Sequence, residues 1–232
     1  MRWELVNPTG HFQVDWKDVP RISTMHSLGL QLVKKKARSL RLRKTDLIVL
    51  QDEKAKRLLY RDAALLCGLS EADADAAATC KQRGDCRQDE DSTDCKVCEK
   101  YWEIMSKCNA LDYDDQVLFA CRVLEADPDL LALYQSRASH LLVDEYQDIN
   151  AAQFRMIELL SRTSRDGLFV VGDDAQSIYG FRGADPGLIL HFETDFPGAA
   201  TPPLSHSRRC HKAIVDDAVK ILQIYYPHNL GT

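Results

Sequence analysis

The sequence predicts an α/β protein in which a parallel sheet carries helices on both faces and is interrupted by a helical subdomain. After Pro128, short apolar runs bounded by turn residues alternate with helical segments, as is typical of buried strands in a parallel sheet. Before Pro128, leucines recur at helical spacing on both sides of a polar stretch at residues 70–98. That period predicts helices rather than strands in this part of the chain.

The composition is that of a globular chain. Its 232 residues are 45% hydrophobic and carry a formal net charge of −5. This content supplies a core, and the charge excludes a protein that coats nucleic acid uniformly, leaving only a local basic face. No apolar window reaches the roughly 18 residues of a membrane span, and the N-terminus lacks a signal pattern. We therefore expect a cytoplasmic protein with no membrane contact and reduced cysteines.

The elements before Pro128 are expected as follows. Residues 21–24 ("RIST") predict a short strand leading into a helix, with Thr24 as the helix N-cap. A helical pattern runs from residue 26 to about 66, and a second one from residue 101 to about 125. Residues 70–98 lose the apolar periodicity and predict a loop.

The elements after Pro128 alternate. Strands are expected at residues 141–144 and 168–173, and helices at 151–161, 186–192 and 210–225. In open parallel sheets, ligands gather at the carboxyl ends of the strands. Those ends are therefore the first place to look for a functional site.

Acidic residues follow both strands. Asp144 and Glu145 come directly after the first, and carboxylate oxygens suit Mg²⁺ and an attacking water. The second strand leads into "GDDAQSIYGFRGA" (172–184), in which Gln176 offers an amide to a phosphate oxygen. The same loop adds the aromatic residues Tyr179 and Phe181 and the cation Arg182.

Two of these segments resemble motifs of a known family. "LLVDEYQDIN" (141–150) and "FVVGDDAQSIYGFRGAD" (169–185) resemble motifs II and III of the UvrD/Rep/PcrA family of superfamily 1 DNA helicases. Three shorter segments fit in order: "STMHSLG" (23–29) is similar to motif Ib, "LDYDDQVLFA" (111–120) to the Asp-containing motif before motif II, and "LSHSRRCHKAI" (204–214) to motif IV. The resemblance implies an ATP-driven motor that moves 3′ to 5′ on single-stranded DNA.

The resemblance also implies a domain organisation. Residues 1–24 and 128–204 would form part of a RecA-like motor core, and residues 25–127 a helical insertion subdomain. Residues 205–232 would begin the second motor domain.

Site roles follow from the matching motif positions. Asp144 would bind Mg²⁺, Glu145 would activate the water, and Gln176 would contact the γ-phosphate of ATP, with Asp173 and Gln147 also at the nucleotide. Arg209 would be the arginine finger, with Arg208 as the alternative. The residues implied to contact DNA are Thr24, His26, Tyr179, Phe181 and Arg182, with Phe181 stacking on a base.

One expected motif is missing from the printed sequence. ATP hydrolysis in this family uses a P-loop, G-x-x-x-x-G-K-[ST], and none of the eleven glycines is followed by Lys. We therefore expect a helicase fragment with little activity alone. The alternatives are a non-catalytic single-strand-binding or regulatory protein, and a half-enzyme completed in trans by a P-loop-bearing chain.

Two further features leave alternatives open. Cys80, Cys86, Cys95 and Cys98 either hold a structural Zn²⁺ or are incidental thiols in a polar insertion. The basic run "KKKARSLRLRK" (34–44) either faces DNA or is a solvated helix face, and its position just after the motif Ib segment favours DNA.

Overall fold

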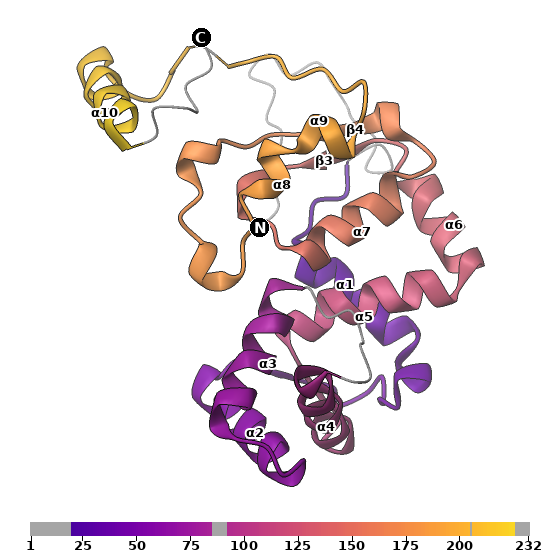
Figure 1. The fold of residues 1–232 in the computed structure, drawn as a ribbon. Helices are drawn as coiled ribbons and strands as arrows, with labels where there is room; N and C mark the ends of the chain where they lie inside the picture. The colour runs from indigo at the N-terminus through magenta and orange to yellow at the C-terminus, as the bar shows by residue number, and fades with distance from the viewer. Residues whose placement is uncertain (1–19, 85–91, 205, 226–232) are drawn as a thin grey trace.

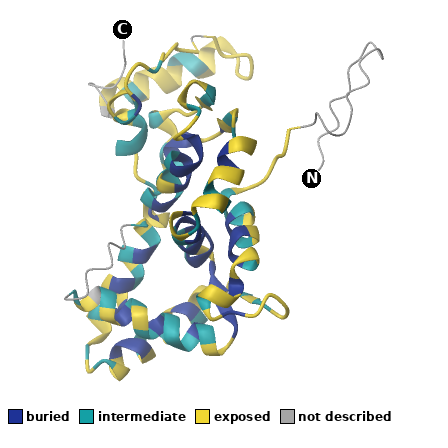
Figure 2. Cartoon of the chain, turned by 90° about the vertical axis from the view of Figure 1, so that its right-hand side faces the viewer, coloured by how far each residue is buried: buried dark blue, intermediate teal, exposed yellow. Residues whose placement is uncertain are grey.

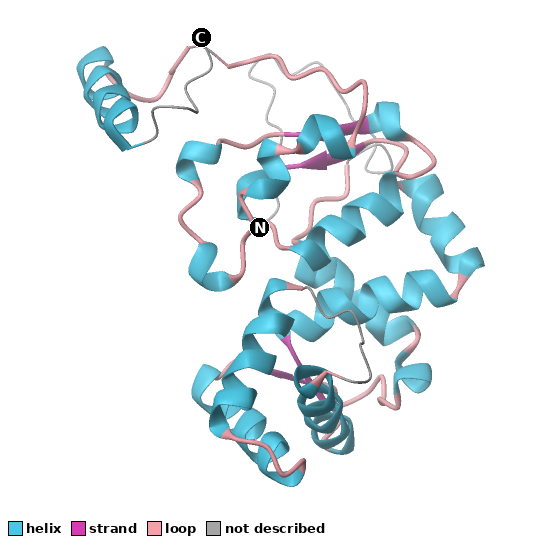
Figure 3. Ribbon diagram, in the orientation of Figure 1, coloured by secondary structure: helices cyan, strands magenta, loops and turns pink. Residues whose placement is uncertain are grey.

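The computed structural model describes residues 20–84, 92–204 and 206–225 of the chain. It is helix-rich, and its strands form two separate two-stranded parallel sheets in the described part (Figure 3). Short 3₁₀ helices lie between the larger elements at Ala37–Leu40, Tyr146–Asp148, Arg165–Gly167, Asp174–Gln176 and Gly180–Arg182. No helix in the described ranges combines the length and apolar character needed to cross a bilayer.

A central group of helices holds the main core. α1 (Met25–Lys35) packs along α5 (Tyr113–Ala126), α5 packs on α7 (Ala151–Ser161), and α6 (Pro128–Arg137) contacts both α5 and α7 (Figure 1). Side-chain caps fix where these helices begin, because an oxygen before each first turn accepts a main-chain hydrogen. The shared core contains Leu32, Val117, Leu124, Tyr134, Met156 and Leu159.

A second group of helices forms the lower part of Figure 1. α2 (Glu53–Leu66), α3 (Glu71–Arg83) and α4 (Thr93–Lys107) pack on one another. Their core includes the stacked rings of Tyr60 and Tyr101, whose centroids are 4.1 Å apart. β1 (Ile48–Leu50) precedes these three helices in the sequence and β2 (Ala110–Asp112) follows them. The two strands pair in parallel, with Val49 opposite Leu111.

The second sheet lies beyond α7. β3 (Leu141–Val143) pairs in parallel with β4 (Leu168–Val170), with Val143 opposite Val170. α7, α8 (Gly187–Leu190) and α9 (Phe192–Asp195) supply apolar side chains to one face of this pair. The opposite face is open in the described residues, since Leu142 is 72% and Phe169 59% exposed. Within the described ranges, the parallel sheet expected after Pro128 therefore consists of these two strands, with helices on one face.

α10 (Lys212–Tyr225) stands apart from the other helices (Figure 1). Most of its residues are exposed, including the apolar Ile214 and Ile224, as the yellow ribbon in Figure 2 shows. Buried residues are concentrated instead in the central and lower helical groups (Figure 2).

Several predicted elements are confirmed. β3 and α7 lie where the sequence indicated them, and Thr24 caps α1, its Oγ1 accepting the main-chain hydrogen of Ser27 at 3.1 Å. α10 begins at Lys212, close to the predicted start. The β4 strand is shorter than predicted, and the helix expected at 186–192 is divided between α8 and α9.

Other predictions before Pro128 were wrong. Residues 21–24 form no strand, and the loop expected at 70–98 contains α3 and the start of α4. α3 buries Ala74 and Ala77, and alanine favours helix strongly without producing a periodicity of large apolar residues. The helices expected at 26–66 and 101–125 are interrupted by β1 and β2, which follow left-handed turns at Asp46 and Asn109.

Candidate functional site

The carboxyl end of β3 carries two exposed carboxylates in a fixed turn. Asp144 Oδ1 accepts the main-chain hydrogen of Glu145 at 3.0 Å. Glu145 itself has a φ of +52°, a left-handed conformation that costs a non-glycine residue free energy. The surrounding structure therefore imposes this turn, and strained residues of this kind concentrate at functional sites.

A buried glutamine connects this turn to the loop after β4. Gln147 is 1% exposed; its Nε2 donates to Glu145 Oε2 at 2.8 Å, and its Oε1 accepts the main-chain hydrogen of Asp173 at 3.0 Å. Its main-chain oxygen also accepts the hydroxyl hydrogen of Ser177 at 3.3 Å. Gln147 was predicted to lie at the nucleotide. In the structure, both the nitrogen and the oxygen of its side-chain amide form hydrogen bonds to other groups of the protein.

The loop after β4 extends the same chain of hydrogen bonds. Gln176 Nε2 donates to Asp173 Oδ2 at 2.7 Å, and Asp173 Oδ1 accepts the main-chain hydrogen of Ala175 at 3.1 Å. Both Asp173 and Gln176 are exposed. The structure thus brings four predicted site residues into one series at the strand ends: Glu145, Gln147, Asp173 and Gln176.

The oxygen donors at this edge fit Mg²⁺ bound together with a nucleotide. Mg²⁺ in such sites takes one or two carboxylates and completes its shell with phosphates and waters, and Asp144 and Glu145 are two exposed carboxylates. Nearby, Asp148 Oδ1 is buried with no hydrogen-bond partner in the described residues. Burial, and then the charge of Glu145, raise the pKa of Asp148.

An exposed aromatic cluster follows on the same loop. The rings of Tyr179 and Phe181 lie with their centroids 6.0 Å apart, and the Arg182 guanidinium lies over both, at 5.3 and 5.5 Å. Phe181 is 72% exposed, so its ring is open to a ligand. A cation and two rings on an exposed loop are the features that stack nucleobases.

The other predicted DNA contacts lie on α1. Thr24 is exposed at the N-cap, and His26 lies edge-on to Tyr113 with ring centroids 5.5 Å apart. Burial lowers the pKa of His26, against the opposing charge of Asp114. In the described part of the chain, no hydrogen bond or ring contact joins Thr24 or His26 to the loop that carries Phe181.

Arg208 and Arg209 are exposed on the segment that leads to α10. This segment runs away from β3 and β4 in Figure 1. Neither arginine forms an ion pair with the carboxylates at the strand ends, as far as the described residues go.

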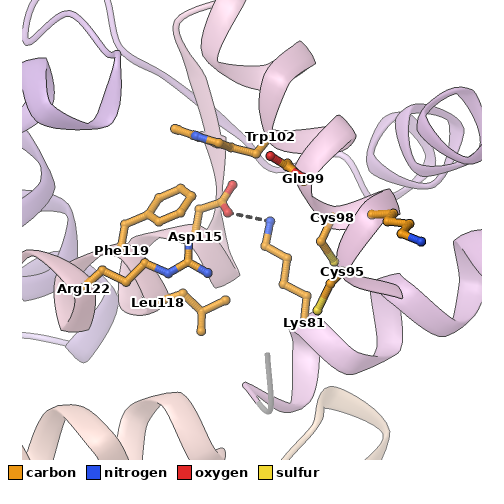
Figure 4. A pocket seen from close by; sticks show the side chains of 10 residues that line it. Lys81, Cys95, Cys98, Glu99, Trp102, Asp115, Leu118, Phe119 and Arg122 are labelled. Atoms are coloured by element: carbon orange, nitrogen blue, oxygen red, sulfur yellow. Dashed lines mark ion pairs between the residues drawn. The ribbon is translucent and has the colours of Figure 1, made fainter. Parts of the chain in front are cut away.

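The cysteine cluster does not support a zinc site. Cys86 lies outside the described residues, and no group of three potential metal ligands is found within the described ranges. Cys98 Sγ donates to the main-chain oxygen of Ala77 at 3.6 Å. Cys95 and Cys98 line a pocket of about 600 Å³ that also contains Trp102 and Arg122 (Figure 4).

A buried ionic cluster contributes Lys81 and Asp115 to the lining of this pocket. Lys81 Nζ contacts Asp112 Oδ2 at 2.9 Å and Asp115 Oδ1 at 2.6 Å (Figure 4 shows the second pair), and Tyr101 donates its hydroxyl hydrogen to Asp112 at 2.9 Å. Burial and the charge of Asp112 raise the pKa of Asp115 to about 7. No role is predicted for these residues from the sequence, although Asp112 and Asp115 lie in the segment "LDYDDQVLFA" (111–120).

Comparison with known proteins gives a consistent family match. The sequence model of the protein family described as UvrD/REP helicase N-terminal domain matches residues 9–197 of this chain. A Leuconostoc citreum protein named ATP-dependent DNA helicase PcrA is 31% identical over 223 residues, covering 89% of this chain and 29% of that protein. Proteins of the same name from Staphylococcus aureus strain Mu50 and Staphylococcus epidermidis are 41% and 40% identical over 123 and 127 residues, covering 53% and 55% of this chain and 17% of each relative. The chain thus spans less than a third of the length of these curated relatives.

Proposed function

Because this chain belongs to the UvrD/REP helicase family, we propose that it supplies part of an ATP-driven motor that moves 3′ to 5′ along single-stranded DNA. The observation that carries the proposal is the hydrogen-bond series from Glu145 through Gln147 and Asp173 to Gln176. This series continues along the chain into the loop that presents Phe181. The nucleotide-facing acids and the aromatic cluster are therefore parts of one connected edge.

At the nucleotide, each residue has a distinct proposed role. Asp144 binds Mg²⁺, which neutralises charge on the phosphate oxygens when it is bound. Glu145 holds the attacking water and accepts its proton, and Gln176 contacts the γ-phosphate. Gln147 keeps the Glu145 carboxylate oriented, since its amide already bonds to Glu145 and Asp173.

At the DNA, Phe181 stacks on a base while Tyr179 and Arg182 support its ring. Stacking on an aromatic side chain is sequence-tolerant, because every base has a π-face, and this suits a motor. Thr24 and His26 contact the DNA backbone from the start of α1. The exposed cations of residues 34–44 extend this surface electrostatically.

The domain division expected from the sequence stays part of the proposal: a motor core from residues 1–24 and 128–204, a helical subdomain at 25–127, and the beginning of a second motor domain at 205–232. Arg209 is the proposed arginine finger. Because the segment with Arg208 and Arg209 lies away from the strand ends here (Figure 1), its approach to a nucleotide requires that segment to move.

A second candidate function concerns these 232 residues by themselves, in which no glycine is followed by lysine. Without P-loop amides and lysine, the phosphates lose most of their cradle. The chain alone then binds single-stranded DNA without turning over ATP, as a regulatory protein or as a half-enzyme completed by a P-loop-bearing chain.

Binding to matched DNAs tests the DNA-directed part of the proposal. Fluorescence anisotropy with a labelled single strand and with the corresponding duplex measures both affinities for the full chain. We expect the single strand to bind more tightly, because its bases are open to the rings of Phe181 and Tyr179. Equal affinity for the two DNAs contradicts base stacking.

A further inference from the structure

The C-terminal end of α3, residues 81–84, lies against the loop that carries Phe181. The main-chain oxygen of Gln82 accepts a hydrogen from Asn150 Nδ2 at 3.0 Å, and Gln82 Nε2 donates to the main-chain oxygen of Phe181 at 3.5 Å. Asn150 Oδ1 meanwhile caps α7 by accepting the main-chain hydrogen of Gln153 at 2.9 Å. One asparagine thus connects the start of α7 to the end of α3.

The approach of these segments depends on two glycines. Gly183 is buried with a φ of +82°, and a Cβ added there would lie 2.4 Å from the main-chain oxygen of Gln82. Gly84 has a φ of +79°, and its Cβ would lie 2.4 Å from the main-chain nitrogen of Ala152. Backbone therefore meets backbone on both sides of residues 81–84, and glycine is the residue that permits it.

The end of α3 is also firmly anchored. Lys81, next to Gln82, is the buried cation that pairs with Asp112 and Asp115 at the start of α5; Figure 4 draws the pair with Asp115. Removing one partner of such a buried pair is strongly destabilising, so the α3 end cannot shift easily. Residues 81–84 therefore offer the Phe181 loop a rigid support.

Above this support, the ring of Phe181 is 72% exposed while its main-chain oxygen is bonded to Gln82. A side chain held in place before binding loses less conformational entropy when a ligand arrives. An exposed aromatic residue on an immobilised backbone is thus preorganised for stacking. Asn150 and Gln82 contribute to this through their contacts with main-chain oxygens.

We propose that residues 81–84 of the helical subdomain position the Phe181 ring for stacking on a base of single-stranded DNA, with Gln82 and Asn150 as positioning residues and Gly183 permitting their contact. This inference rests on the proposed function, since it assumes that Phe181 stacks on DNA. It links three segments that are distant in sequence: 111–116 through Lys81, 141–150 through Asn150, and 172–184 through Gly183.

Two variants break the contact in different ways. Gly183→Ala places a Cβ against Gln82, and Asn150→Asp keeps the oxygen that caps α7 while replacing the donor to Gln82 with an acceptor. Gly180→Ala is the matched control, because a Cβ at residue 180 meets nothing within 4 Å. If Gly183→Ala unfolds the chain, Asn150→Asp still tests the contact between residues 81–84 and the Phe181 loop.

Two measurements on the full chain decide the question. Amide hydrogen exchange of residues 179–184 without DNA reports on the support, and anisotropy with labelled oligothymidylate reports on stacking. We expect both variants to raise exchange about tenfold or more and to weaken DNA binding by about 5- to 160-fold, the range expected for loss of one stacked base. Adding Phe181→Ala to either variant should weaken binding no further, whereas a general structural defect would add to it.

The failures are distinguishable. Unchanged exchange at residues 179–184 in both variants overturns the positioning role and leaves the proposed function standing. Raised exchange with no effect of Phe181→Ala on DNA affinity overturns stacking itself, and the positioning of its ring with it. Additive losses in the double variants also overturn the inference, because Asn150 and Gly183 would then act independently of Phe181.

Discussion

Gln147 accepts the main-chain hydrogen of Asp173 at 3.0 Å while lying almost completely buried between the ends of β3 and β4. The same side chain donates to Glu145 at 2.8 Å, so the orientation of that carboxylate depends on the position of the loop after β4. A movement of Asp173 and Gln176 would therefore change the orientation of the Glu145 carboxylate. Hydrogen-bond series of this kind lose more than one contact when a member is removed.

Replacing Gln147 with methionine should destabilise the chain. The change keeps the side-chain volume similar but leaves the main-chain hydrogen of Asp173 without its partner, which costs about 1–3 kcal/mol of unfolding free energy. Urea unfolding measures this. The same change at the exposed Gln176 is the control, with an expected effect within about 0.5 kcal/mol. Equal effects at both positions would show that the buried bridge is not what stabilises this edge.

The purified chain should show no DNA-stimulated ATP hydrolysis. The carboxylates of Asp144 and Glu145 are present, but the amides and lysine of a P-loop, which hold the β- and γ-phosphates, are not found in its sequence. Phosphate release with and without single-stranded DNA measures the rate, and a chain with Asp144→Ala and Glu145→Gln gives the background. A DNA-dependent rate that the double variant abolishes would refute this expectation.

The buried acids beside Lys81 should make stability depend on pH. Burial and the charge of Asp112 raise the pKa of Asp115 to about 7, from the ordinary aspartate value of about 3.9. Between these values the folded chain holds a proton that the unfolded chain has released, so stability is lost as pH rises toward 7. Asp115→Asn keeps an oxygen for the α5 cap and removes this titration.

The difference in unfolding free energy, variant minus wild type, should therefore become more positive by up to about 2–3 kcal/mol between pH 5 and pH 8, since each unit of pKa shift is worth about 1.4 kcal/mol. Urea unfolding at several pH values measures it. Asp129→Asn, at an exposed position on α6, is the control, with no comparable trend. A difference for Asp115→Asn that stays constant across this range would rule out the raised pKa.

The basic run should affect the salt dependence of DNA binding. Lys35 and Lys36 are exposed and Lys34 is half-buried. Changing all three to Gln should flatten the slope of log affinity against log salt by up to about 2, since each phosphate contact on a single strand contributes about 0.7. Anisotropy titrations at several salt concentrations measure the slope. The same change at Lys54, Lys96 and Lys107 controls for net charge, and equal slopes in both triple variants would mean that residues 34–44 are a solvated face.

The sequence predicted best where local signals agree with the fold. β3 is an apolar run followed by acids, and α7 begins with Asn150 and Gln153 capping each other, so both were found near their true positions. The position of Asp144 and Glu145 at the end of β3 was predicted for the same reason, because residues that follow a buried strand come to the sheet edge; their role at a nucleotide stays a prediction. Their connection through Gln147 was not predicted, since it depends on the pairing of β3 with β4.

Elsewhere, tertiary packing decided the outcome. α3 buries alanines against α2 and α4, and small residues leave no periodic pattern of large apolar side chains. β1 has three residues and is stabilised by pairing with β2, about 60 positions later. Gln82 lies on α3, which the sequence did not predict, and Asn150 caps α7, which it did. Their contact depends on how the two helices pack, so no local pattern indicates it.

Phe181 provides the most direct test of single-strand binding at this edge. Anisotropy titrations with a labelled single strand should show that Phe181→Ala weakens binding by about 1–3 kcal/mol, because one base loses its stacking partner. Phe169→Ala removes another exposed phenylalanine, 59% exposed on β4, and should leave the affinity unchanged. Equal losses in the two variants, or no loss in Phe181→Ala, would contradict a DNA-stacking role for this loop.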